Sequence, residues 1–316
     1  MKSKVLGGVI GLATGDALGV PVEFSSKERL KQFPVTYMLT GGTYGQPAGT
    51  WSDDSSMAFC LIEAICEKNG IDYQEIGNKF VQWMFFNHWT PHGETFDYGG
   101  TTYRAVSAIK NGTPALDAGQ KDEYSQSNGG LMRILPIAYY IHAKKLDADQ
   151  ATELTHNITK ITHAHPACLI ASDIYIKIAV NLLEGMTPDK AYWTAKKDII
   201  KRYNTPRWVE ELKKFPRIIL DDISTFPEKT INGRAYIVNT LEAALWAFLT
   251  SNNYKETVLK AVNLGDDTDT VGAIAGGLAG LYYGYEAIPK EWLDELARLD
   301  DIIQLATCYY NMLYKS

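Results

Sequence analysis

Two short acidic segments contain the residues of this chain whose types and spacing best suit chemistry. Residues 52–55 read Ser-Asp-Asp-Ser and residues 266–270 read Asp-Asp-Thr-Asp-Thr, each just before an apolar stretch with helical spacing. Adjacent carboxylates repel one another, which raises the pKa of one of them unless a cation or a helix N-terminus compensates. Taken singly, each segment is explained more simply as a helix cap, because Ser, Thr and Asp are favoured there.

Taken together, the two segments indicate a metal site. They provide five aspartates and several hydroxyl groups, with no cysteine or histidine nearby in sequence. Such an all-oxygen ligand set suits Mg²⁺ or Mn²⁺ better than zinc. A calcium-binding EF-hand is excluded, because Val271 and Leu278 stand where that loop needs an oxygen ligand and a bidentate glutamate. The sequence therefore predicts a site assembled from distant segments, which in two-metal enzymes holds ions about 3.5–4 Å apart.

A loop of small residues offers a second kind of chemistry. Residues 125–130 read Ser-Gln-Ser-Asn-Gly-Gly and precede a helix predicted from near residue 130. Small residues let backbone N–H groups point at an anion, and the dipole of the following helix favours a phosphate there. From the residues alone, an ordinary loop is the simpler interpretation.

The segment Thr162-His163-Ala164-His165 contains two histidines two positions apart. They would not share a helix face, and no third ligand for a transition metal is visible nearby. We interpret His165 as structural, and His163 as either a packed or capping residue or one that borders a ligand.

Helical patterns dominate the elements that must position these residues, and strand patterns are few and short. The predicted helices cover residues 53–67, 74–88, 100–111, 130–143, 147–162, 166–184, 188–203, 207–214, 235–250, 253–263, 269–284 and 300–314. Loops rich in Gly, Pro, Thr and Asp lie at residues 40–51, 90–102 and 118–130, and such loops commonly carry binding groups. The predicted fold is all-α, and the even composition indicates one domain over residues 1–316.

Two ladders of glycine occur at helical spacing. One consists of Gly7, Gly11, Gly15 and Gly19, and the other of Gly272, Gly276, Gly280 and Gly284. Each set lies along one helix face, although glycine costs a helix interior about 1 kcal/mol relative to alanine. We therefore predict two closely packed central helices, which would bring the acidic residues at their ends together.

Composition limits the partners of the protein. The net charge of -6 disfavours a broad nucleic-acid surface, which needs clustered Lys and Arg, so a nucleic-acid substrate is disfavoured without being excluded. The four cysteines have no paired or metal-type spacing and are expected to be reduced core residues. No apolar run reaches the length of about 18 residues that crosses a bilayer, and Asp16 argues against a secretory signal. These features predict a cytoplasmic protein with no membrane partner.

The chain resembles the ADP-ribosylglycohydrolase family, which includes dinitrogenase reductase-activating glycohydrolase and the ADP-ribosylarginine and ADP-ribosylserine hydrolases of animals. Five motifs in the family order carry the resemblance between residues 7 and 284: Gly-Asp-Ala-Leu-Gly-Val-Pro-Val-Glu at 15–23, Trp-Ser-Asp-Asp-Ser-Ser-Met at 51–57, Ser-Asn-Gly-Gly-Leu-Met-Arg at 127–133, Thr-His at 162–163, and Gly-Asp-Asp-Thr-Asp-Thr-Val-Gly-Ala-Ile at 265–274. The resemblance implies a compact orthogonal bundle of helices around a central metal-binding cleft.

The resemblance also implies roles for particular residues. Two Mg²⁺ or Mn²⁺ ions would be bound by Ser52, Asp53, Asp54, Asp267, Asp269 and Thr270. Catalysis would involve Glu23, Asp54 and Asp97, and the substrate would contact Asp97, Gly99, Ser125, Ser127, Asn128, Gly129 and His163. Asp97 is equally well explained as a carboxylate that stabilises its own loop. Asp266 departs from the glycine common in the family and is expected to be a solvated neighbour rather than a ligand.

The activity implied is hydrolysis of the N- or O-glycosidic bond between ADP-ribose and an acceptor, either a protein side chain or a small molecule. This reaction reverses ADP-ribosylation. A catalytically silent, ADP-ribose-binding or crystallin-like member is the first alternative, and a binuclear metal phosphoesterase is the second. The acceptor, whether arginine, serine, O-acetyl-ADP-ribose or nucleic acid, is left open by the sequence.

Overall fold

The computed structural model describes residues 1–315, and this part of the chain contains sixteen α-helices and no β-strand longer than an isolated bridge. The helices are α1 (Lys2–Gly19), α2 (Lys27–Gln32), α3 (Asp53–Lys68), α4 (Tyr73–Phe86), α5 (Gly100–Lys110), α6 (Pro136–Lys144), α7 (Ala148–Lys160), α8 (Pro166–Leu183), α9 (Pro188–Tyr203), α10 (Val209–Leu212), α11 (Pro216–Ile219), α12 (Ile237–Leu249), α13 (Tyr254–Val262), α14 (Thr268–Tyr283), α15 (Lys290–Leu293) and α16 (Leu299–Tyr314). The predicted all-α class is confirmed.

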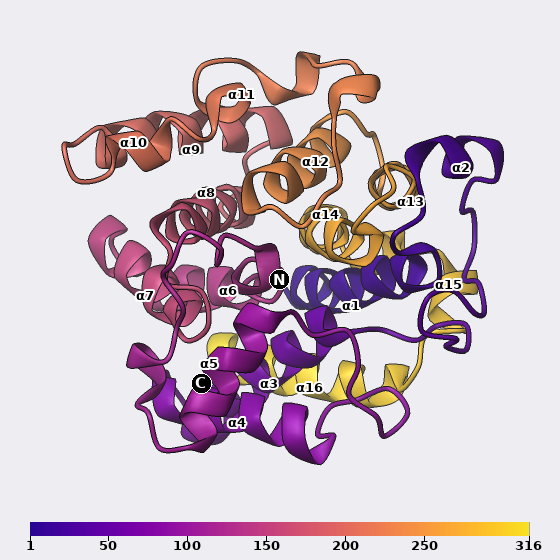
Figure 1. Cartoon of the computed structure of the whole chain (residues 1–316), viewed down its shortest axis with the longest axis horizontal. Helices are drawn as coiled ribbons and strands as arrows, with labels where there is room; N and C mark the ends of the chain where they lie inside the picture. Colours follow the sequence, from indigo (N-terminus) through magenta and orange to yellow (C-terminus); the bar gives the residue numbers. More distant parts are fainter. Residues whose placement is uncertain (316) are drawn as a thin grey trace.

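The helices α1 and α14 form an antiparallel pair at the centre of the molecule, with the other helices around them (Figure 1). The two glycine ladders face each other along this pair. A Cβ atom on Gly15 would lie 2.1 Å from the carbonyl oxygen of Gly272, and one on Gly7 would lie 2.2 Å from that of Gly280. Because real Cβ atoms do not approach other atoms so closely, the two backbones can touch only through glycine. The predicted close packing is confirmed.

This pair places the ends of two helices side by side. Gly19, at the end of α1, packs against the backbone of Asp269 in the first turn of α14. Helix α3 begins beside them, since the backbone N–H of Ser52 bonds to the carboxylate of Asp16 on α1. The acidic segments therefore sit where three buried helices meet.

Two predicted helix boundaries were wrong. The helix predicted from residue 130 begins only at Pro136, because proline lacks an N–H group and is preferred at the first helical position. Residues 128–130 form a short 3₁₀ turn instead. The helix predicted over 207–214 is shortened to α10, because Pro216 opens the next helix and disfavours helical backbone just before it.

The prediction that no apolar run is long enough to cross a bilayer was wrong. Residues Lys2–Val22 and α8 are long and apolar enough to span a membrane by length and composition. In the most apolar 18-residue stretch of each, however, 89% and 83% is buried within the protein, as expected for core helices.

All four cysteines are free, as predicted, but the expectation that all lie in the core was wrong for Cys308, and Cys66 is only partly buried. That residue is exposed on the outer face of the amphipathic helix α16.

Candidate active site

The two acidic segments converge. The hydroxyl of Thr270 on α14 donates a hydrogen bond to Asp54 Oδ2 on α3 (3.3 Å), and the hydroxyl of Ser52 donates to the same oxygen (3.3 Å). Ser52 also caps α3, because its side chain accepts a bond from the N–H of Asp54. Ser52 therefore both caps α3 and belongs to the acidic cluster, so the helix-cap and metal-site interpretations of this segment do not exclude each other.

Asp16 fixes the start of α3. Its fully buried carboxylate accepts hydrogen bonds from the backbone N–H groups of Ser52 (2.9 and 3.0 Å) and Ser55 (3.1 Å) and from the Ser55 hydroxyl (2.5 Å). These bonds satisfy N–H groups that the first turn of a helix leaves without partners. Burial raises the pKa of Asp16 to about 7, although the four bonds act in the opposite direction.

Protein groups compensate only part of the negative charge in the cluster. Burial, followed by the charges of Asp97 and Asp267, raises the pKa of Glu23 to about 9. Burial and neighbouring carboxylates likewise raise the pKa of Asp53, Asp54 and Asp269 well above the usual range. Three buried carboxylate oxygens, Glu23 Oε2, Asp54 Oδ1 and Asp269 Oδ1, have no hydrogen-bond partner.

These properties fit a divalent cation. One carboxylate oxygen from each of Glu23, Asp267 and Asp269 lies within 4.8 Å of the others, close enough to share one ion. Buried charges without partners are costly unless they are paired or coordinate a metal. An all-oxygen donor set of this kind suits Mg²⁺ or Mn²⁺. The sequence had assigned Glu23 to catalysis, whereas its position also makes it a candidate ligand.

A cleft of about 190 Å³ opens beside this cluster. Its lining residues come from six parts of the chain: Glu23, Phe24, Asp53, Asp97, Gly99, Thr102, Ser127, Asn128, Gly129, Met132, Ala235, Asp267, Asp269 and Thr270. Most predicted site residues therefore share one cleft. Ser52 and Asp54 are buried behind the lining, and Asp266 is half-exposed, 4.0 Å from Arg234.

Asp97 is held toward the cleft by its loop. Its backbone adopts a left-handed conformation (φ 59°), and the hydroxyl of Tyr44 donates a hydrogen bond of 2.5 Å to its Oδ1. Aspartate tolerates this conformation better than most residues. Tyr44, which packs on Phe96, was not identified from the sequence.

Residues 127–129 of the small-residue loop also line the cleft. The side-chain amide of Asn128 donates to Asp267 Oδ2 (2.7 Å), so Asn128 joins the loop to the acidic cluster. Ser127 bonds to His163, which is fully buried behind Gly129 rather than in the lining. Ser125 is also buried and turned away, because its hydroxyl pairs with Asp122 and Arg104.

A buried guanidinium supports this loop from below. Arg133, which has no exposed surface, donates hydrogen bonds to the Gly129 carbonyl (2.6 Å) and the Thr162 hydroxyl (2.8 Å). Burial lowers the pKa of Arg133 to about 9, and Asp53 acts weakly in the other direction. Among residues 1–315, no carboxylate forms an ion pair with Arg133. Its guanidinium therefore leaves an unpaired positive charge next to the loop at Gly129.

This all-helical scaffold gathers five carboxylates and a small-residue loop around one cleft, which has the concave form and convergent polar groups of an enzyme active site. The model of the ADP-ribosylglycohydrolase family matches residues 1–315. The chain belongs to this family and is an ADP-ribosylglycohydrolase.

Individual relatives agree with this assignment. The chain is 31% identical to the ADP-ribosylarginine hydrolase Tri1 of Serratia proteamaculans, over 98% of this chain and 79% of the relative. It is 30% identical to the ADP-ribosyl-[dinitrogen reductase] glycohydrolase of Rhodospirillum rubrum, over 94% and 91%. A solved structure, titled ADP-ribosylglycohydrolase-related protein complex, superposes with a TM-score of 0.80 at 32% identity and covers 98% of both chains.

Proposed function

We propose that this protein is a divalent-metal-dependent hydrolase that releases ADP-ribose from the arginine side chains of modified proteins. The convergence of Glu23, Asp267 and Asp269 within the reach of one ion carries the metal dependence. Two observations favour an arginine acceptor. The relatives include ADP-ribosylarginine hydrolases, and the lining of the cleft contains five carboxylates but no lysine or arginine, which suits a cationic guanidinium.

Two Mg²⁺ or Mn²⁺ ions would be held by Ser52, Asp53, Asp54, Asp267, Asp269 and Thr270, with Glu23 beside them. When bound, such ions supply Lewis acidity and orient the hydroxyl groups of the ribose. They would also offset the mutual repulsion of the carboxylates.

The chain's own groups then act on the glycosidic bond. Cleavage at C1′ develops positive charge on the ribose, so the carboxylates of Glu23 and Asp97 stabilise the transition state more than the ground state. Once bound ions offset the burial and repulsion that raise the pKa of Glu23, its ionised carboxylate would accept a proton from the attacking water. Asp97, fixed by Tyr44, would pair with the guanidinium of the substrate, which leaves as a neutral guanidine and then takes up the proton that Glu23 removed from water. The backbone N–H groups of residues 127–130 would bind the diphosphate.

The decisive experiment compares hydrolysis of ADP-ribosylarginine and ADP-ribosylserine peptides with Mg²⁺, with Mn²⁺ and with EDTA. We expect metal-dependent release of intact ADP-ribose from arginine, and a loss of at least about 100-fold in Asp267→Asn. Asp266→Asn is the matched control, because Asp266 is half-exposed and pairs with Arg234 instead.

Other outcomes would contradict the proposal in distinct ways. Release of AMP or phosphate would identify a phosphoesterase. Tight calorimetric binding of ADP-ribose without turnover of any peptide would identify a silent binding protein. Faster turnover of the serine peptide would keep the hydrolase and reject the arginine acceptor.

A further inference from the structure

Four polar side chains form a continuous chain of hydrogen bonds behind the wall of the cleft. The guanidinium of Arg133 donates to the hydroxyl of Thr162 (2.8 Å), and that hydroxyl bonds to His163 Nδ1 (2.8 Å). His163 Nε2 bonds in turn to the hydroxyl of Ser127 (2.9 Å). Arg133, Thr162 and His163 have no exposed surface, whereas Ser127 lines the cleft. The chain therefore runs from the interior of the protein to the surface that a ligand would contact.

The direction of the inner bonds follows from the chemistry of the donors. A guanidinium only donates, so the oxygen of Thr162 must accept from Arg133. The hydrogen of Thr162 then needs an acceptor, because a buried hydroxyl without one is costly. Within residues 1–315, His163 Nδ1 is the only other hydrogen-bond partner of this hydroxyl. Thr162 therefore donates to Nδ1, which must be the nitrogen of the ring that carries no hydrogen.

The outer bond runs in the same direction. Complete burial, followed by the charges of Arg133 and Arg104, lowers the pKa of His163 to about 3, so the ring is neutral at pH 7. A neutral imidazole with a bare Nδ1 carries its hydrogen on Nε2 and donates it to Ser127 Oγ. The hydroxyl of Ser127 makes no other hydrogen bond in the described chain. Its own hydrogen is therefore free to point into the cleft.

We propose that Arg133 and Thr162 are positioning residues for ligand binding, because they fix the tautomer of His163 and so keep the hydroxyl of Ser127 as a donor to the cleft. The oxygens of a diphosphate only accept hydrogen bonds, so a hydroxyl held as a donor suits them. With the opposite tautomer, Ser127 would donate to Nε2 and be lost to the ligand. The inference rests on the proposed function only in taking the diphosphate of ADP-ribose as that ligand.

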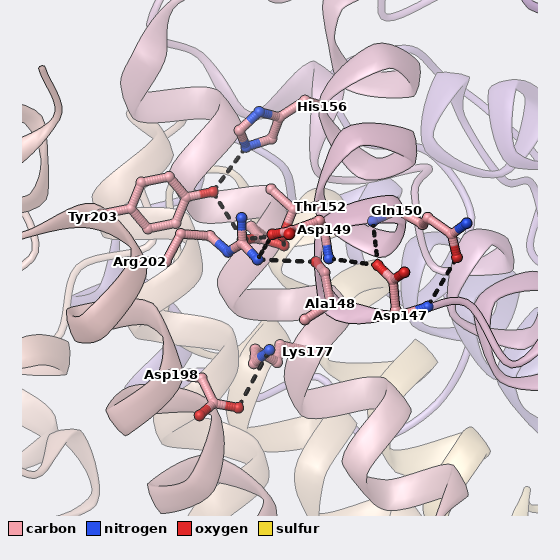
Figure 2. Close-up of polar contacts among 11 residues, drawn as sticks. Asp147, Ala148, Asp149, Gln150, Thr152, His156, Lys177, Asp198, Arg202 and Tyr203 are labelled. Carbon is pink, nitrogen blue, oxygen red and sulfur yellow. Dashed lines mark hydrogen bonds and ion pairs between the residues drawn. The ribbon is translucent and has the colours of Figure 1, made fainter.

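Another histidine provides an internal reference. His156 Nε2 contacts the hydroxyl of Tyr203 (2.8 Å), and this hydroxyl donates to the buried carboxylate of Asp173 (2.8 Å). Figure 2 shows His156 and Tyr203 approaching each other from α7 and α9. Because Asp173 takes the hydrogen of Tyr203, the tyrosine oxygen accepts from Nε2. The neutral ring of His156 thus also carries its hydrogen on Nε2, but through partners outside the chain that reaches Ser127.

The first measurement records the tautomer of His163 in the unmodified protein, by long-range ¹H–¹⁵N nuclear magnetic resonance of the imidazole rings. The signals are assigned by their loss in His163→Gln and in His156→Gln. We expect a bare Nδ1 and a hydrogen on Nε2 in both rings. A hydrogen on Nδ1 of His163 would overturn the proposal whether or not the protein is active, because Ser127 would then donate to the ring.

The second measurement tests what sets this tautomer. Thr162→Val keeps the shape of the side chain but removes the hydrogen that occupies Nδ1, so the Nδ1–H form of His163 should appear. Arg133→Met, which frees the Thr162 oxygen to accept from Nδ1, should have the same effect, and Thr162→Ser should restore the tautomer. The matched control is Thr159→Val, which removes a buried hydroxyl that bonds only to the Thr155 carbonyl. An unchanged tautomer in Thr162→Val, or an equal change in the control, would reject the positioning role. Thermal unfolding verifies that each variant is folded.

Calorimetric binding of ADP-ribose connects the tautomer to the ligand. Ser127→Ala should weaken binding at least about fivefold, because it removes a hydrogen bond to a charged group, and Thr162→Val should weaken it about threefold. In the Ser127→Ala background, Thr162→Val should change the affinity by less than about 1.5-fold, since both substitutions act on one bond. Additive losses, or normal binding by Ser127→Ala, would overturn the proposal. Failure of the unmodified protein to bind ADP-ribose would instead reject the proposed function, and the tautomer of His163 would still decide the role of Thr162.

Discussion

Thr270 donates a hydrogen bond to Asp54 from a position 216 residues further along the chain. The contact joins the first turns of α14 and α3, so the N-termini of both helices point into one acidic cluster. Helix dipoles favour negative charge at their N-termini, which lowers the cost of gathering these carboxylates. The oxygens Asp54 Oδ1 and Asp269 Oδ1 nevertheless have no partner. The site is therefore built with more negative charge than the protein alone neutralises.

We predict that Asp269→Asn stabilises the metal-free protein while abolishing its response to metal. Asp269 is almost fully buried among like charges, so removing its charge relieves repulsion. The melting temperature in EDTA should rise by a few degrees, whereas Mn²⁺, which should stabilise the wild type, should have little effect on the variant. Scanning fluorimetry with and without Mn²⁺ provides the measurement. An equal response of wild type and variant to Mn²⁺ would exclude Asp269 as a ligand.

Asp16→Ala should destabilise the protein and impair the site, although Asp16 does not line the cleft. The substitution leaves the N–H groups of Ser52 and Ser55 without their buried acceptor, at a cost of about 2–4 kcal/mol in the free energy of unfolding. Urea denaturation measures this loss. Because the start of α3 would shift, the metal concentration required for half-maximal activity should also rise. A variant with normal stability would show that other groups hold α3.

The central features of the fold and site could be predicted because they repeat or cluster in the sequence. Glycine at every fourth position has few explanations other than close helix packing, and that packing sets the end of α1 against residues 268 and 269. Residues 52–54 meet residues 267–270 as expected, but this contact also depends on Asp16, which anchors the start of α3 to α1. Asp16 illustrates what could not be predicted. Its partners Ser52 and Ser55 lie 36 and 39 residues away, and its only signal was a charge within an apolar helix.

Side-chain direction was the other limit. Ser125 lies in the predicted loop, yet it turns toward Arg104, and such a choice depends on neighbours that only the folded structure brings near. Tyr44 was missed because it comes from a loop without periodicity. Pro136 in the sequence explains why α6 begins there. The apolar pattern of the residues before it nevertheless suggested that the helix begins near residue 130.

Gly15→Ala should separate the central helices. The added methyl group would meet the Gly272 carbonyl at 2.1 Å, a backbone atom that cannot move aside without shifting α14. We expect a loss of about 3 kcal/mol despite the better helix propensity of alanine. Gly70→Ala is the control, because its nearest neighbour is 4.0 Å away, and it should change stability by less than about 0.5 kcal/mol. Equal effects in the two variants would contradict the ladder's role.

His163 should make the protein sensitive to mild acid. Its complete burial, followed by the charges of Arg133 and Arg104, lowers its pKa from 6.5 to about 3. A lowered pKa in a basic group means that the unfolded state takes up the proton first. Stability from this source is therefore intact above pH 6.5 and falls as the pH drops from 6.5 toward 3.

Between pH 7.5 and 5.0 this single group should reduce the free energy of unfolding by about 2 kcal/mol. His163→Gln, which keeps a polar side chain but does not titrate, should start less stable at pH 7.5 because it loses bonds to Ser127 and Thr162. It should then lose about 2 kcal/mol less than the wild type as the pH is lowered, because one proton fewer is taken up on unfolding. Urea denaturation of both proteins at the two pH values decides the matter. Parallel losses would mean that His163 is protonated in the native state and that the loop above it accommodates the charge.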